Sequence, residues 1–172
     1  MAIRNFSIFG ALLLGGCLTF HPDPANTDPQ VLHVYKSPVC TCCQRWVQHA
    51  RRERYTVTVS NVVDMDSVRH ELGVPRYAES CHIAVIGGYF ISGHVPAEDI
   101  SRLLAEHPNI AGLAVPGMPV GPPGMEGPDA KPYSVLAIQK DGNYEVFADH
   151  QPSPEQNGAV GPSADNAHKY LK

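Results

Sequence analysis

The chain has 172 residues, of which 43% are hydrophobic, and these values suit one globular domain of modest size with ordinary tails. Its formal net charge is −4, and no basic stripe runs along the sequence. Because nucleic-acid binding needs a positive surface, this charge pattern argues against nucleic acid as a partner.

The first 16 residues have the pattern of an export signal. Arg4 gives a positive start, an apolar run follows over 6–14, and two glycines precede Cys17. The run is too short to span a bilayer but fits a secretory signal. A cysteine after two glycines resembles a bacterial lipobox, which predicts Cys17 as a lipidated first residue; a plain cleaved signal is the alternative. Residues 17–30, with several prolines, indicate a tether.

The chain from 31 to 108 alternates between strand and helix patterns. The predicted strands are 31–35, 55–63, 83–86 and 89–92. The predicted helices are 42–54, 64–72 and 96–108. The resulting order, β-α-β-α-β-β-α, is the element order of a thioredoxin-like α/β domain.

Beyond Pro108 the chain is rich in glycine and proline and carries two methionines, Met118 and Met125. A terminal β-hairpin is predicted over 133–148, with its turn at Asp141-Gly142. The thioredoxin-like domain, with this Gly/Pro/Met-rich extension, is therefore expected to span residues 31–149. The polar tail of residues 150–172 is expected to be disordered.

Three cysteines lie within four residues, Cys40-Thr41-Cys42-Cys43, where the first strand meets the first helix. Cys40 and Cys43 have the C-x-x-C spacing of a redox pair. The N-terminus of a helix stabilises a thiolate, which is both a nucleophile and a metal ligand. Structural disulfides usually join segments that are distant in the sequence, and clustered cysteines cannot do so. This turn therefore indicates a functional site. Cys42 could scramble a redox disulfide, but it is suited to metal binding.

A fourth cysteine, Cys81, is expected to face this turn, because the loop before the third strand of a thioredoxin-like fold lies opposite the C-x-x-C motif. Thiolates and thioethers select soft ions such as Cu(I), and zinc is the alternative for four cysteines. Because sulfur can bridge metals, more than one Cu(I) per chain is expected.

Met118 and Met125 favour copper over zinc, since thioethers are weak zinc ligands and good Cu(I) ligands. Packing of their loop onto the domain is the alternative role. His94, which follows the fourth strand, is predicted as a ligand or as a partner of a ligand. The role of His82 stays open between a ligand and a hydrogen-bonding residue of the loop.

Four segments together resemble the CopG-type copper-resistance family, which is unrelated to the DNA-binding repressor of the same name. These segments are 35–43, 80–82, 93–97 and 112–119, and the resemblance covers about residues 31–149. Members of that family are exported, thioredoxin-like, copper-binding proteins whose genes accompany copper efflux systems. The resemblance implies that the four clustered cysteines bind copper and that the Met-bearing extension closes over them.

The predicted function is therefore that of an envelope copper-resistance protein that binds several Cu(I) ions. The resemblance also implies interconversion of Cu(I) and Cu(II), or transfer of copper to an exporter. Three functions stay open: a copper-dependent oxidoreductase in which Cys40 and Cys43 or the metals change oxidation state, a non-catalytic scavenger or chaperone, and a thiol–disulfide oxidoreductase. Cys42 argues against the third.

The expected partners are copper ions and a copper efflux system. The chain is expected to be a monomer in the periplasm. It is expected to contact the outer membrane only through a lipid on Cys17.

Overall fold

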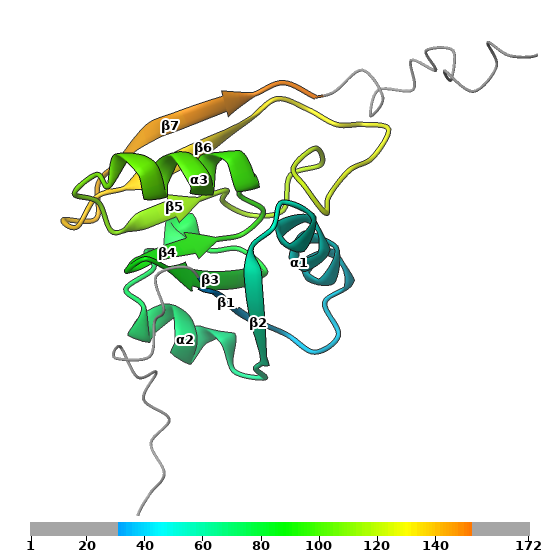
Figure 1. Ribbon diagram of the computed structural model, residues 1–172, viewed down its shortest axis with the longest axis horizontal. Helices are drawn as coiled ribbons and strands as arrows, with labels where there is room; N and C mark the ends of the chain where they lie inside the picture. The colour runs from blue at the N-terminus through cyan, green and yellow to red at the C-terminus, as the bar shows by residue number, and fades with distance from the viewer. Residues whose placement is uncertain (1–30, 153–172) are drawn as a thin grey trace, which may run out of the picture.

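The computed structural model describes residues 31–152 (Figure 1). The strands in this range are β1 Val31–Lys36, β2 Thr56–Asn61, β3 His82–Ile86, β4 Tyr89–Ser92, β5 Gly112–Ala114, β6 Tyr133–Ile138 and β7 Tyr144–His150. The helices are α1 Thr41–Arg52, α2 Met65–Glu71 and α3 Ala97–Glu106, together with a 3-10 turn at Arg76–Ala78.

All these strands form one sheet in the order β2-β1-β3-β4-β5-β6-β7. The β1–β2 and β4–β5 pairs are parallel, and the other pairs are antiparallel. Lys36 at the end of β1 pairs with His82 at the start of β3. Ile83 pairs with Ser92 at the end of β4, and Ser92 pairs with Ala114 at the end of β5. The segments that follow β1, β4 and β5, and the one that precedes β3, therefore lie at one end of the sheet.

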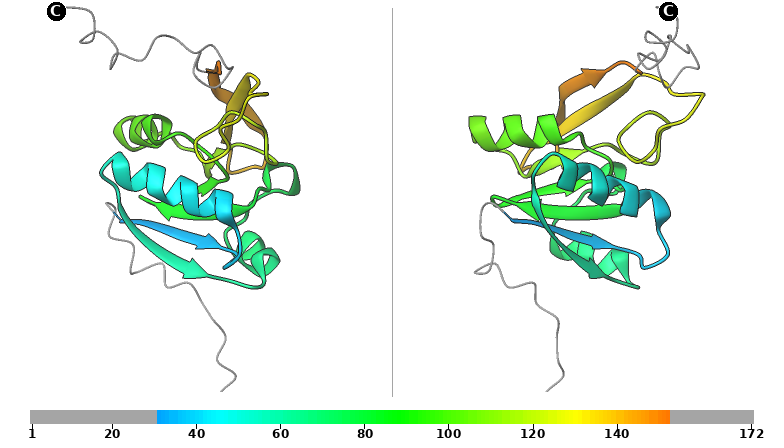
Figure 2. Two further views of the ribbon diagram at one scale, coloured as in Figure 1. Left: turned by 90° about the vertical axis from the view of Figure 1, so that its right-hand side faces the viewer. Right: turned by 45° about the vertical axis from the view of Figure 1, so that its right-hand side comes forward.

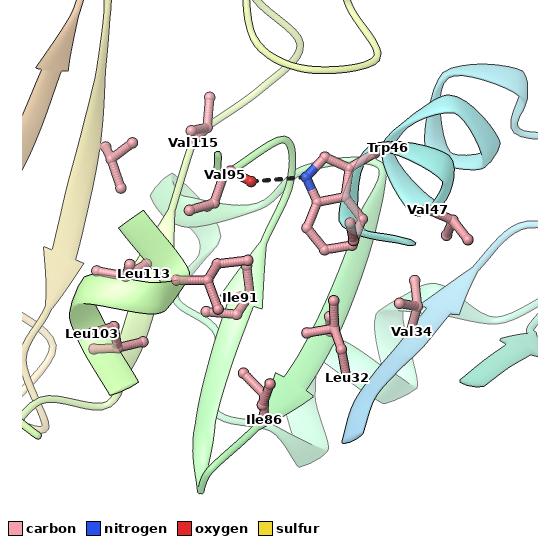
Figure 3. Packing of buried hydrophobic residues seen from close by; sticks show 14 of the residues in the cluster. Leu32, Val34, Trp46, Val47, Ile86, Ile91, Val95, Leu103, Leu113 and Val115 are labelled. Carbon is pink, nitrogen blue, oxygen red and sulfur yellow. Dashed lines mark hydrogen bonds between the residues drawn. The ribbon is translucent and has the colours of Figure 1, made fainter. Parts of the chain in front are cut away.

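Helices cover both faces of the sheet, because alternating strand residues enter two separate hydrophobic clusters. Leu32 and Val34 pack in a cluster with Trp46 of α1, and α3 contributes to the same cluster (Figure 3). Tyr35 points to the other face, where it packs in a cluster with Val68 of α2. Figure 1 shows the result, with α1 and α3 on one side of the sheet and α2 on the other.

Helix α1 begins at a cysteine that serves as its N-cap. The backbone of Cys40 is extended, and its sulfur accepts a hydrogen bond from the N–H of Cys43 at 3.3 Å. Trp46 and Ala50, one turn apart, are fully buried against the sheet. The indole Nε1 of Trp46 donates to the carbonyl of Val95 at 2.9 Å, so its buried polar atom is paired. The start of α1 is therefore held beside the end of β4.

The mixed α/β class predicted from the sequence is confirmed. Strand β5 lies in a segment that was predicted only as a Gly- and Pro-rich extension. Its three residues carry little local strand signal, and they form a strand because β4 and β6 supply partners on both sides. His150 was predicted in the tail, but it is the last residue of β7 because it pairs with Tyr133.

Three predicted features lie wholly or partly outside the described residues. They are the export signal over 1–16, the tether over 17–30 with the lipidation site at Cys17, and the tail from 153 onward. Between residues 31 and 152, none of the helices has the length and apolar character needed to cross a membrane.

The segment between β5 and β6, residues 115–132, is here named the covering loop because it lies against the start of α1 (Figure 2). Arg45 on α1 donates from Nε to the carbonyl of Gly124 at 2.9 Å. A Cβ on Gly124 would lie 2.8 Å from the nitrogen of Trp46 and 2.9 Å from the carbonyl oxygen of Cys42. Gly124 also has a φ of +83°, so both its space and its backbone conformation require glycine.

We predict that Gly124→Ala lowers the free energy of unfolding by about 2–3 kcal/mol, because it adds a backbone clash to the strain of a positive φ. Gly142→Ala is the matched control, since Gly142 has a φ of +86° and nothing within 4 Å of the added Cβ. The control should cost about 1 kcal/mol. Urea denaturation followed by the fluorescence of Trp46, the only tryptophan, measures both values. An equal loss of unfolding free energy in the two variants would show that the covering loop is not closely packed against α1.

Candidate metal centre

Four cysteine sulfurs meet at the end of the sheet where α1 begins. The Sγ atoms of Cys40, Cys42, Cys43 and Cys81 all lie within 4.8 Å of one another. A disulfide joins Cys40 and Cys43, and Cys42 and Cys81 are free thiols. Cys42 Sγ lies 3.4 Å from Cys40 Sγ and 4.0 Å from Cys81 Sγ. The structure thus holds an oxidised C-x-x-C pair beside two free thiols.

The two parts of this cluster come from different elements. Cys42 and Cys43 lie in the first turn of α1, and Cys81 directly precedes β3. Cys43 Sγ is 3.6 Å from the carbonyl oxygen of Cys81. Only a reduced Cys43 has a proton to donate to that oxygen, so this hydrogen bond belongs to the dithiol form. The role predicted for Cys40 and Cys43 as simultaneous metal ligands likewise requires the reduced pair.

Two histidines also lie beside Cys81. His94 Nε2 is 3.1 Å from Cys81 Sγ, and His82 Nδ1 is 3.4 Å from the same sulfur. Both side chains are fully buried, and the ring of Trp46 packs on His82 with its centroid 4.4 Å away. Cys81, His82 and His94 each offer a ligand atom within 4.8 Å of the others. This second group shares Cys81 with the group of four cysteines.

A hydrogen bond to the covering loop sets the tautomer of His94. Its Nδ1 lies 2.7 Å from the carbonyl oxygen of Pro123. A carbonyl can only accept, so Nδ1 carries the proton and donates it, which leaves the lone pair of Nε2 directed at Cys81. Metal-binding histidines commonly have this arrangement, in which the second ring nitrogen donates to a carbonyl oxygen. His94 is therefore held ready to bind a cation through Nε2.

Burial leaves the Cys81 side of the site without charge at neutral pH. Burial raises the pKa of Cys81 to about 12, and the neighbouring Cys42 adds to that increase. Burial also lowers the pKa of His94 and lowers that of His82 well below its usual value, with His94 and Lys36 contributing to the second shift. A cation that displaces the thiol proton would convert Cys81 to a thiolate and would meet two neutral imidazoles.

The predicted methionine ligands belong to the covering loop but differ in exposure. Met118 follows Gly117, which forms a bridge with Ser80 next to Cys81, yet its side chain is 60% exposed. Met125 follows Gly124 and is half-buried. Each methionine directly follows a glycine that lies near the site: Gly117 pairs with Ser80, and Gly124 lies against α1. Their role as ligands stays a prediction.

The structure brings His82 to the site, which the sequence pattern left undecided. His82 was predicted in a loop, but it is the first residue of β3. Alternation along β3 turns its ring to the same face as Ala84 and Ile86, where α1 packs. The only signal in the sequence was its position directly after Cys81.

One family model matches a part of the chain that includes three residues of this site. Residues 78–125, which include Cys81, His82 and His94, match the family described as "Protein of unknown function, DUF411". A search of curated proteins found no match.

Two solved structures, named "Copper resistance protein copG", Form 2 and Form 1, are each 41% identical to this chain with a TM-score of 0.67. The matches cover 70% and 73% of this chain and 97% and 100% of the solved chains, respectively. They confirm the resemblance predicted from four short sequence segments. With this identity over nearly the whole of both solved chains, the chain belongs to the CopG family of copper resistance proteins.

Proposed function

We propose that the reduced protein binds Cu(I) through the thiolates of Cys40, Cys42, Cys43 and Cys81 and thereby contributes to copper resistance. The observation that carries this proposal is the convergence of four sulfurs within 4.8 Å from two separate elements. Thiolates select soft ions, and Cu(I) is the soft ion that fits a family of copper resistance proteins. Sulfur atoms this close can each bridge two metals, so the site takes more than one Cu(I).

The C-x-x-C pair gives the proposed site a redox role. Oxidation of the Cys40 and Cys43 thiols to the disulfide releases two electrons and two protons. Two Cu(II) ions accept these electrons and become two Cu(I) ions, which balances the step. The Cys40–Cys43 disulfide, with Cys42 and Cys81 as free thiols, supports this proposal because it is the form that such a step would produce. Interconversion of Cu(I) and Cu(II), or hand-over of Cu(I) to an efflux system, would use this pair.

The proposed fold of the redox unit is thioredoxin-like. Its support is the arrangement of β2-β1-β3-β4, in which β1 and β2 are parallel and β3 is antiparallel to both neighbours. The C-x-x-C turn lies at the junction of β1 and α1, where the helix dipole favours a thiolate.

The proposed location is the periplasm, with a lipid on Cys17 as the anchor to the outer membrane. The support is the sequence alone: a short apolar run over 6–14, followed by two glycines and Cys17. Met118 and Met125 are proposed as additional thioether ligands supplied by the covering loop.

A thiol–disulfide oxidoreductase is the second candidate function, and the Cys40–Cys43 disulfide at a helix N-terminus favours it. Cys42 argues against it, since its sulfur lies 3.4 Å from Cys40 and could attack the disulfide. A redox titration of the copper-loaded protein separates the candidates. Reversible cycling at constant copper content supports copper redox chemistry, whereas loss of copper on oxidation supports binding without turnover. Exchange with a disulfide substrate in the absence of copper supports the second candidate.

We predict that Cys42→Ser weakens Cu(I) binding by about tenfold or more, because it removes the sulfur between Cys40 and Cys81. The same variant should still form the Cys40–Cys43 disulfide on oxidation. Anaerobic titration of the reduced protein against a competing Cu(I) chelator measures the affinity and the copper number. Thr41→Ser is the control, because it alters a neighbouring exposed residue without changing the sulfurs. Unchanged copper number and affinity in Cys42→Ser would contradict the four-cysteine site.

We also predict that copper affinity rises with pH. Because the pKa of Cys81 is about 12, this thiol is protonated from pH 6 to 8 and must lose its proton to solvent when the sulfur binds an ion. That release alone raises the apparent affinity by about tenfold per pH unit. In Cys81→Ala the slope of log affinity against pH should fall by about one, while the exposed His70→Gln keeps the wild-type slope. An unchanged slope in Cys81→Ala would mean that Cys81 is not a ligand.

A further inference from the structure

We infer that strand β2 is an interaction surface for a second copy of this chain, and that the two β2 strands pair antiparallel about a two-fold axis at Val59. The inference is independent of the copper proposal, because β2 contributes no residue to the candidate metal centre. It differs from the monomer that the sequence led us to expect.

Strand β2 forms one border of the sheet and pairs only with β1 among the described residues (Figure 2, left). The N–H of Val62, directly after β2, donates to a carbonyl of β1 at 2.9 Å. Backbone groups in a strand point alternately to its two sides, so the N–H and C=O groups of Val57, Val59 and Asn61 point away from β1. The side chain of Arg51 agrees with this direction, since it donates to the carbonyl of Val57 at 3.5 Å. A second strand would displace only this long contact.

The two borders of the sheet differ in how they resist pairing with another strand. Border strands usually carry a bulge, a charge or a proline that prevents such pairing. At the opposite border, β7 has an irregular register with β6 and carries the carboxylates of Glu145 and Asp149. In addition, the carbonyl of Phe147 in β7 accepts a hydrogen bond from Arg102 at 2.6 Å. The sequence of β2, TVTVSN, has no charge or proline, and its register with β1 is continuous. The border at β2 therefore lacks these protections.

The outward backbone groups select the register of the proposed pairing. With the axis at Val59, Val57 of each copy lies opposite Asn61 of the other, so every outward residue faces an outward residue. An axis at Thr58 would instead place Asn61 opposite Tyr55, which precedes the strand. The half-buried side chains of Val57 and Val59 pack on the α1 face of the sheet, and the second copy would cover their open side.

The charges at the two ends of β2 are complementary in this arrangement. The segment before β2 has a net positive charge from four exposed residues, Arg51, Arg52, Glu53 and Arg54. The segment after β2 carries the exposed carboxylates of Asp64 and Asp66, of which Asp66 also pairs with Arg69. Antiparallel pairing places the basic end of each strand beside the acidic end of the other, and the two-fold symmetry repeats this contact. A second copy of the same chain is therefore the partner that fits this border.

The same arrangement separates the two metal centres. The cysteine turn follows the end of β1, which runs parallel to β2. Since the two copies run in opposite directions, their cysteine turns lie at opposite ends of the joined sheet. We therefore expect the dimer to form with or without a bound metal.

Sedimentation velocity of the full-length chain tests the inference, with Cys17→Ser and a reducing agent present so that no disulfide joins two copies. We expect the sedimentation coefficient to rise from that of a monomer to that of a dimer between micromolar and millimolar concentration. Hydrogen exchange at the amides of Val57, Val59 and Asn61 should become slower over the same range. A monomer at every concentration would overturn the inference. Exchange at these amides that is slow but independent of concentration would also overturn it, because the chain itself would then cover β2.

Two substitutions of the exposed Asn61 should have opposite effects, because this residue lies near the basic end of the second copy. Asn61→Lys should raise the dissociation constant of the dimer by about tenfold or more. Asn61→Asp should lower it by about threefold at low salt, and high salt should remove this gain. Val59→Pro removes an outward N–H without removing a bond to β1, and it should abolish the dimer.

Val146→Lys is the matched control, because it places the same charge on β7 at the opposite border, where Val146 is 57% exposed. This variant should keep the dissociation constant of the parent chain. Circular dichroism checks that each variant is folded. Changes of the same sign in Asn61→Lys and Asn61→Asp, or a dimer that persists in a folded Val59→Pro variant, would show that the copies associate elsewhere and would overturn the inference.

Discussion

The pairing of β3 with β1 on one side and β4 on the other determines where the chemistry of this protein lies. The strand register brings the end of β1, the start of β3 and the end of β4 together. In this register Lys36 pairs with His82, and Ile83 pairs with Ser92. A shift of one residue would turn the ring of His82 to the opposite face of the sheet. The positions of the cysteine turn, Cys81 and His94 all follow from this register.

Helix α1 and the covering loop enclose the site that the sheet defines. Trp46 anchors the helix by its buried indole and packs on the ring of His82, while the sulfur of Cys40 caps the first turn. The covering loop reaches the same place from β5 and contacts it through Gly124 and Pro123. The close approach of Gly124 to α1 and the hydrogen bond of His94 to the carbonyl of Pro123 mean that the position of the covering loop and the orientation of the His94 ring are coupled.

The electrostatic state of the site follows from its burial. Buried thiol and imidazole groups are most stable when neutral, so Cys81, His82 and His94 are without charge at neutral pH. A cation bound at Cys81 would change this, because it would displace the thiol proton and balance the charge of the thiolate. The disulfide acts on the same site differently, because it withdraws two sulfurs and leaves Cys42 and Cys81 as thiols. In the proposed function, oxidation and metal binding are therefore alternative uses of Cys40 and Cys43.

The sequence by itself determined the features that depend on local spacing: the C-x-C-C turn, the amphipathic helices, the terminal hairpin and the family resemblance. Only the tertiary structure decided the features that depend on distant partners. It made 112–114 a strand, turned His82 into the site, joined His94 to Pro123 and left Met118 exposed. The physical reason is that the spacing of apolar residues and the capping of helices depend on residues close together in the sequence. The geometry of the candidate site depends instead on strand register and on contacts between segments far apart in the chain.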